Sequence, residues 1–234
     1  MELEIKALSP LAISRQKPGS SINETMDYIP GSVIRGAVAA RILQESGNES
    51  EDLSESGGDF QRLFLSENPA IFQNAYLNSL YDDDGDFNEV LVLPATSLSS
   101  KTNSGFKSEE KNGVFDTLID RFCAENNGCL YDPNCPEDGG RVEPYSEFYS
   151  KPEDEEEYFL HKTKKRLLTR TGINRRRATS EEEVLYSIEV INESPINHRK
   201  TEKSVVFCGS ILVSDNELAD SLQNFIQERK ISFV

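Results

Sequence analysis

The sequence predicts an α+β fold in which helices cover one face of an antiparallel sheet. Amphipathic helices are expected over residues 32–45 and from Ser214 onward, and apolar strand-like runs lie before and after each. A long polar stretch over residues 99–160 interrupts this order and predicts an insertion within a single domain spanning residues 1–234. The predicted order is strand, helix, strands, insertion, strands, helix and strand.

The first strand and helix have the clearest local signals. Apolar residues recur through Met1–Ile13, typical of a strand that breaks near Pro10. After a polar loop at 14–29, a Pro-Gly turn at 30–31 precedes Ser32, which we expect to cap the helix. Apolar residues four positions apart then predict one buried face of that helix: Ile34, Val38 and Ile42.

The segment after this helix predicts an acidic connection and a hairpin. Residues 46–58 are acidic and Ser-rich, and a short helix is expected over 59–65. Two strand-like runs follow, at 70–80 and 89–98, and the acidic Gly-containing turn at 82–86 predicts that they pair as a hairpin.

The insertion contains one expected helix and three regularly spaced cysteines. Apolar residues at helical spacing predict a helix over 114–124. Five residues separate Cys123 from Cys129 and Cys129 from Cys135, whereas zinc sites favour pairs two to four residues apart. His161 or Cys208 could supply a fourth ligand, but Cys208 lies in an apolar run and is expected to be buried. We therefore expect no metal or other cofactor and keep zinc as an alternative.

The last third of the chain predicts two strands, a helix and a final strand. The strands are expected at 184–191 and 204–213, and Ser214 with Glu217 forms a capping-box pattern. Leu218 and Leu222 lie on one face of the helix that follows, and a strand is expected at 230–234. This order of elements is that of the ferredoxin-like fold.

Composition narrows the compartment and the class of activity. The chain has no long apolar run and no signal-like N-terminus, so it is expected to lie in the cytoplasm with its four cysteines reduced. No phosphate-loop, dinucleotide-binding or zinc-protease motif occurs, and neither histidine has a nucleophilic partner nearby in the sequence. We expect no enzymatic activity.

The charge pattern bears on nucleic-acid binding. A net charge of −16 is unusual for an RNA-binding protein, which normally carries a basic footprint. Residues 161–177, however, hold eight basic residues and no acidic one. Because salt screens charges beyond about 8–10 Å, such a block creates its own local field. It could bind RNA, or it could dock an acidic protein.

Two groups of residues are candidates for phosphate contacts. The first is the open end of the helix at Ser32, where free N–H groups and Arg35 favour an anion, together with Arg15 and Lys17 in the preceding loop. The second lies in the basic block and comprises Lys164, Lys165, Arg170, Asn174, Arg175, Arg176 and Arg177.

Several segments, in order, resemble a known family. Tyr-Ile-Pro-Gly-Ser at 28–32 and Arg-Gly-Ala at 35–37 are similar to the first-helix signature of the CRISPR-associated RAMP proteins. The segments at 10–13, 17–20, 93–101, 113–116 and 171–177 extend the match. Together they most closely resemble the RAMP subunit of type III-D effector complexes.

The resemblance implies a fold and a role. The implied fold is the ferredoxin-like, RRM-like RAMP fold. The implied role is a non-catalytic subunit that binds the CRISPR guide RNA (crRNA) and caps its 5′ repeat-derived handle in antiviral defence. The implied partners are crRNA, other RAMP subunits and the large polymerase-like subunit. Asn174 would read a base edge or a 2′-hydroxyl group.

Two alternatives and one departure accompany the resemblance. Backbone-type RAMP subunits cut target RNA with an aspartate before the signature helix, and Asp27 is the nearest acid here. A protein-only adaptor that docks the large subunit is the other alternative. The Gly-rich loop of the family, expected after the last strand, is absent from this sequence, so a second polypeptide could complete the fold.

Overall fold

The computed structural model describes residues 1–15, 24–46, 58–78, 89–151, 157–174, 179–193 and 205–229. The chain divides into two compact units. The first contains Met1–Ser79 and Thr163–Val234, and the second contains Leu80–Lys162. The second unit includes the stretch 99–160 that the sequence marks as an insertion, but it starts earlier, at Leu80.

An antiparallel sheet forms the centre of the first unit. Its strands run in the order β1-β15-β6-β4, and β5 pairs with the far end of β15. The register places Ile5 opposite Phe207, and Phe207 opposite Leu77. The strand bounds are β1 Glu2–Lys6, β4 Tyr28–Ile29, β5 Ile71–Phe72, β6 Ala75–Leu77 and β15 Val206–Leu212.

Three helices bury their apolar faces against one face of this sheet. They are α1 (Gly31–Ser46), α2 (Asp59–Phe64) and α4 (Asn216–Arg229). Alternation along the strands turns Ile5, Phe207 and Leu77 to the same side, where they join one core cluster with side chains from all three helices. The predicted α+β architecture, with helices against an antiparallel sheet, is confirmed.

The helix faces agree with the sequence, but the predicted caps do not. Ile34 and Val38 of α1 and Leu218 and Leu222 of α4 are buried as expected. The N-terminus of α4, however, is capped by Asp215, whose carboxylate accepts a hydrogen bond from the Leu218 amide at 3.1 Å. The prediction that Ser214 caps this helix is therefore wrong. Asp215 directly precedes the first helical residue, Asn216, so it is the Asp215 side chain that reaches the amide of the third helical residue.

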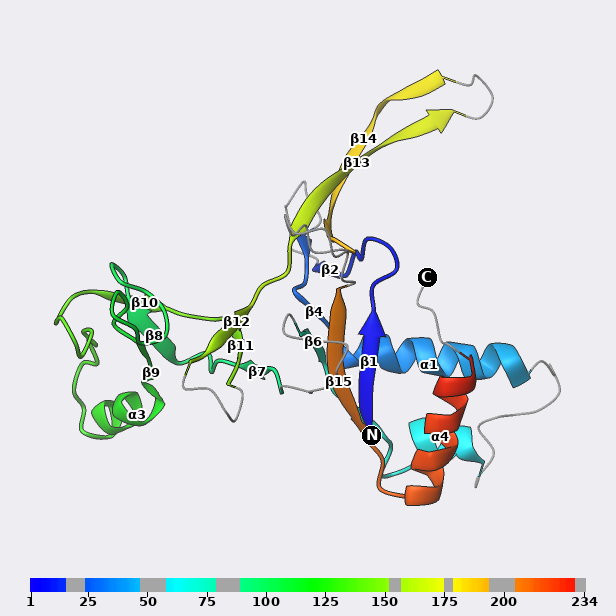
Figure 1. Cartoon of the computed structure of the whole chain (residues 1–234), viewed down its shortest axis with the longest axis horizontal. Helices are drawn as coiled ribbons and strands as arrows, with labels where there is room; N and C mark the ends of the chain where they lie inside the picture. Colours follow the sequence, from blue (N-terminus) through cyan, green and yellow to red (C-terminus); the bar gives the residue numbers. More distant parts are fainter. Residues whose placement is uncertain are drawn as a thin grey trace. The chain divides into compact units, whose positions relative to one another are not determined.

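Two antiparallel pairs extend from the first unit. The hairpin of β2 (Ser14–Arg15) and β3 (Glu24–Thr25) is short. The ribbon of β13 (Lys165–Asn174) and β14 (Thr179–Ile191) is much longer and shifts register between Thr171 and Ile173. Figure 1 shows this ribbon running out beyond the end of the central sheet.

The second unit is built from short strands and one helix. Its two three-stranded sheets have the orders β10-β8-β9 and β12-β11-β7. The helix α3 covers Leu118–Asn126. The strand bounds are β7 Leu91–Val92, β8 Ser97–Ser100, β9 Val114–Asp116, β10 Val142–Pro144, β11 Phe148–Ser150 and β12 Phe159–His161.

Two predictions for the middle of the chain are wrong. The runs at 70–80 and 89–98 do not pair with each other in the described residues: β6 pairs with β15 and β4, whereas β7 pairs with β11. The helix predicted over 114–124 begins only at Leu118, because Val114–Asp116 instead pair with β8. In both cases a partner distant in sequence overrides the local pattern.

Some predicted segments lie outside the described residues. They are the acidic turn at 82–86, most of the acidic connection at 46–58 and the final strand at 230–234. In the part of the chain that is described, no helix is long and apolar enough to cross a membrane.

Candidate nucleic-acid interface

The start of α1 is closed by neighbouring groups more fully than the sequence predicts. The Pro30 carbonyl accepts hydrogen bonds from the Val33 and Ile34 amides at 2.9 and 3.2 Å, so the helix begins at Gly31. The Gly31 amide donates to the Asn74 side-chain oxygen at 2.9 Å. Ser32 therefore lies inside the first turn, and the prediction that it is the N-cap is wrong. Its exposed position leaves it beside the positive end of the helix.

A close approach of β5 explains why Gly31 stands at this position. A Cβ atom on Gly31 would lie 1.9 Å from the Phe72 carbonyl oxygen. The backbone of the strand therefore contacts the backbone of the helix, which fixes the direction in which α1 leaves the turn. The sequence contains the Pro-Gly pair but gives no sign of this contact.

Arg35 is engaged within the protein. Its guanidinium donates to the Phe64 carbonyl oxygen at 2.8 Å and lies 5.5 Å from the centre of the Phe64 ring. These contacts tie α1 to the end of α2. Arg35 keeps an exposed position, but part of its hydrogen-bonding capacity holds the fold together.

The second predicted group meets the β2–β3 hairpin at the base of the ribbon. Lys165 donates to the Thr25 carbonyl oxygen at 2.9 Å and lies 3.0 Å from the Asp27 carboxylate and 3.5 Å from that of Glu189. The Thr25 amide in turn donates to Glu189 at 3.0 Å. Since β2 pairs with β3 in the register Arg15 to Glu24, the backbone of Arg15 reaches this same junction.

The junction fixes the ribbon and also neutralises some of its charge. Arg166 pairs with Glu193 at 3.1 Å, and Lys165 has two carboxylates beside it. Asp27 also accepts a hydrogen bond from the Thr163 hydroxyl. Lys165 and Arg166 therefore hold the base of the ribbon in place. The sequence of the basic block did not indicate this structural role.

Further along the ribbon the basic side chains are open to solvent. Arg170 is exposed and makes no ion pair with any residue of the described segments. Lys164 is exposed too, but it precedes β13 and lies at the base of the ribbon, where its carbonyl oxygen accepts a hydrogen bond from the Asn192 amide at 2.8 Å. The side chains of Arg15 and Asn174 and the whole of Lys17, Arg175, Arg176 and Arg177 lie outside the described residues.

The two units differ strongly in charge. The second unit contains 20 of the 41 acidic residues but only seven of the 25 basic ones, so it carries −13 of the net charge of −16. The first unit, which holds every predicted phosphate-contacting residue, is left at −3. The large negative total is thus mainly a property of the other unit.

The face of the sheet opposite the helices presents two tyrosines. The register places Tyr28, Tyr76, Cys208 and Glu4 side by side across four strands. The Tyr28 and Tyr76 rings lie 5.8 Å apart. Cys208 is a buried free thiol, as predicted, and burial raises its pKa to about 11. The tyrosine pair was missed because the two residues meet only through strand pairing.

The cysteines of the second unit do not form a metal centre in the described part of the chain. Cys123 and Cys129 are exposed and Cys135 is buried, and no group of three or more His, Cys, Asp or Glu side chains could hold a metal ion there. His161 is buried and bonded to the Ser150 hydroxyl at 2.8 Å. Cys208, the other fourth ligand considered, is a buried thiol of β15.

A comparison with known protein families identifies a match that covers most of the chain. The model of the RAMP superfamily matches residues 4–228 of the chain. The match starts in β1 and ends in α4, and it includes both compact units. The search of curated proteins found no match.

Proposed function

The chain belongs to the RAMP superfamily, and from that premise we propose that it is a non-catalytic crRNA-binding subunit of a type III-D CRISPR interference complex. The family gives the coarser conclusion, a CRISPR-associated RNA-binding role within a multi-subunit complex. The finer proposal is that this subunit caps the 5′ repeat-derived handle of the guide in antiviral defence. Its partners would be crRNA, other RAMP subunits and the large polymerase-like subunit.

The observation that carries the proposal is the β13–β14 ribbon on the less charged unit, in which β13 holds three basic residues and no acidic one, while β14 holds four glutamates. The β13–β14 ribbon is anchored through Lys165 at its base, carries the exposed Arg170 further out, and leads toward the three arginines at 175–177. The first unit, at −3, repels a polyanion far less than the total charge implies. Phosphate contacts from this ribbon would position the guide, and Ser32 at the start of α1 would add a second contact.

The proposed fold is ferredoxin-like. In support, β1 and β6 flank β15 in an antiparallel sheet, α1 lies between β1 and β6 in the chain, and α4 follows β15. In this fold a fourth strand pairs with the other edge of the first. The strand predicted at 230–234 lies outside the described residues. A second polypeptide that completes this edge is part of the same proposal.

The proposal of a non-catalytic role includes a structural role for Asp27. Its carboxylate is paired with Lys165 and bonded to Thr163, so it supports the ribbon base. The competing role, cleavage of target RNA, is tested with the Asp27→Asn variant in the assembled complex. Unchanged target cleavage is the expected result, and loss of cleavage with normal guide content would favour the catalytic alternative.

Crosslinking tests the binding proposal itself. Ultraviolet crosslinking of the complex to labelled guide RNA, followed by peptide mapping, should find crosslinks in residues 14–36 or 163–191. The acidic residues 80–162 serve as the internal control and should give none. Crosslinks confined to 80–162, or none in the chain at all, would contradict the proposal and favour the protein-only adaptor.

A further inference from the structure

The helix α3 exposes its apolar face. Leu118, Ile119 and Phe122 keep 57%, 74% and 71% of their surface exposed, and no residue of the helix is buried. Leu118 and Phe122 are four residues apart, as are Ile119 and the exposed Cys123, so together they form one continuous stripe on the helix. An amphipathic helix normally turns such a stripe toward its own core.

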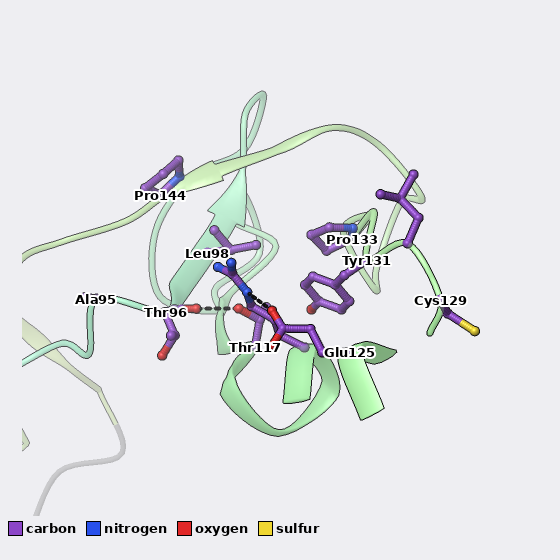
Figure 2. Close-up of a pocket in the computed structure, with 11 residues that line it drawn as sticks. Ala95, Thr96, Leu98, Thr117, Glu125, Cys129, Tyr131, Pro133 and Pro144 are labelled. Atoms are coloured by element: carbon purple, nitrogen blue, oxygen red, sulfur yellow. Dashed lines mark hydrogen bonds and ion pairs between the residues drawn. The ribbon is translucent and has the colours of Figure 1, made fainter. Parts of the chain in front are cut away.

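The polar side of α3 borders an open pocket of its own unit, and it is exposed too: the Arg121 and Glu125 side chains keep 62% and 65% of their surface accessible. Arg121 and Glu125 form an ion pair at 3.2 Å and line an open pocket of about 550 Å³ together with Leu98, Tyr131 and Pro144. Figure 2 shows Glu125 of α3 among the residues that line this pocket. The helix α3 therefore lies on the surface of its unit, with neither its apolar nor its polar side buried.

The start of the helix is firmly fixed in this orientation. The buried Thr117 hydroxyl donates to the Thr96 carbonyl oxygen at 2.7 Å. The Asp116 carboxylate accepts hydrogen bonds from the Thr96 hydroxyl at 2.6 Å and the Leu118 amide at 3.0 Å. These two bonds hold the pKa of Asp116 below its ordinary value, the hydroxyl contact most strongly. Because these hydrogen bonds fix the first turn of α3, the direction in which the stripe faces is fixed as well.

Charge restricts what can cover the stripe. Asp120 and Glu125 border it, because they lie three residues before Cys123 and three residues after Phe122. The unit as a whole carries 20 acidic and seven basic residues. A nucleic acid or an anionic membrane would be repelled, and a second copy of the chain would bring the same negative charge.

We propose that the stripe of Leu118, Ile119, Phe122 and Cys123 is a docking surface for a neighbouring protein subunit that offers an apolar pocket rimmed by lysine and arginine. This inference rests on the proposed function, because the neighbour is a subunit of the same complex. On this inference the two units have different roles: the first unit contacts the guide RNA, and α3 of the second unit binds a neighbouring protein subunit. Large exposed apolar patches of this kind mark interaction sites, and buried aromatic anchors carry most of the energy of such interfaces.

The test uses the assembled complex, purified through a tag on another of its protein subunits. The double variant Ile119→Ser/Phe122→Ser should lower the occupancy of this chain at least tenfold, while its thermal unfolding stays unchanged because both side chains are exposed. The matched control is Leu8→Ser in the first unit, which is 84% exposed and should leave occupancy unchanged. Occupancy of the wild-type chain should also fall as salt is raised, because the rim contacts are electrostatic.

A photo-crosslinking amino acid at position 122 gives a second reading that does not depend on a mutant's stability. The expected product joins this chain to a lysine- and arginine-rich peptide of another protein subunit. Crosslinks to a second copy, to guide RNA or to nothing would overturn the inference, as would full occupancy of the double variant. If the wild-type chain fails to join a guide-containing complex, the proposed function fails with it; if only the variant and crosslinking results go the other way, the docking inference alone fails.

Discussion

Single residues at the ribbon base carry structural roles that their charge alone does not reveal. Lys165 is held by a carbonyl oxygen and two carboxylates, although the sequence places it in a block of apparent RNA-contacting cations. A lysine with this many protein partners serves to hold elements together. The residues around it, Thr25 and Glu189, could not be picked out from the sequence because they meet only in three dimensions.

Replacing Lys165 by methionine tests this structural role. The substitution leaves Asp27 and Glu189 near each other without their shared cation, so we expect the free energy of unfolding to fall by about 1 kcal/mol. Urea unfolding of the full chain measures the change. Lys107→Met is the control, since among the described residues Lys107 pairs with the exposed Glu137 alone and should matter less. Equal effects in both variants would contradict the role assigned to Lys165.

His161 makes the second unit sensitive to pH. The side chain is buried in β12, and this burial lowers its pKa below the ordinary value of 6.5. The unfolded chain therefore takes up a proton before the folded chain does, so stability is complete above about pH 6.5 and declines as the pH falls below it.

Hydrogen exchange of the β11 and β12 amides checks this prediction. Protection in the wild type should fall between pH 7.5 and pH 5.5, after correction for the intrinsic exchange rates. The His161→Gln variant retains a polar partner for Ser150 but should lose the pH dependence. If the corrected protection of the wild type is the same at pH 7.5 and pH 5.5, the pKa of His161 is not lowered by burial.

At the scale of elements, two glycines in α1 should respond in opposite directions to the same change. A Cβ atom at Gly31 would meet the Phe72 carbonyl oxygen at 1.9 Å, whereas nothing lies within 4 Å of one at Gly36. Gly31→Ala should therefore destabilise the protein by about 2 kcal/mol or more. Gly36→Ala should stabilise it by about 0.5–1 kcal/mol, since alanine loses less entropy in a helix.

Thermal unfolding of the two variants measures the contrast. Each variant serves as the control for the other, because the substitution, the helix and the assay are shared. A neutral Gly31→Ala would mean that the helix start and β5 can separate, which would contradict the close approach of the two backbones. Destabilisation by both variants would instead contradict the open space around Gly36.

Helices were predictable from the sequence where one apolar face meets the core, and strand pairing was not. Ile34 with Val38 and Leu218 with Leu222 indicate α1 and α4 directly, since four-residue spacing is local information. The strand β6 pairs with β15, more than a hundred residues away, so the nearby acidic turn gave a wrong hairpin. The predicted start of α3 was wrong for the same reason, because Val114–Asp116 pair with β8 instead of joining the helix.

The candidate site was predictable in part. The Pro-Gly turn, the helix after it and the basic block were visible as patterns, and the structure places the first two at the start of α1. The contacts that close this helix start could not be predicted, since Asn74 and Phe72 approach it from another element. The exposed face of α3 was also hidden, because an amphipathic pattern does not say which way a helix turns.

At the scale of the whole molecule, charge and surface chemistry separate the two units. The first unit carries −3 and the basic strand β13, and the second carries −13 and an exposed apolar helix face. A chain built this way can hold a polyanion with one unit while the other binds protein. The net charge of −16 therefore does not argue against RNA binding.

The salt dependence of guide-RNA affinity tests this account most directly. The full chain is compared with a variant in which Arg170, Arg175, Arg176 and Arg177 are all replaced by alanine, and Arg121→Ala in the second unit is the control. We predict weaker binding and a log–log salt slope that is shallower by about 0.7 for each lost phosphate contact, with no change in the control. An unchanged slope in the four-arginine variant would contradict the claim that the ribbon holds the guide.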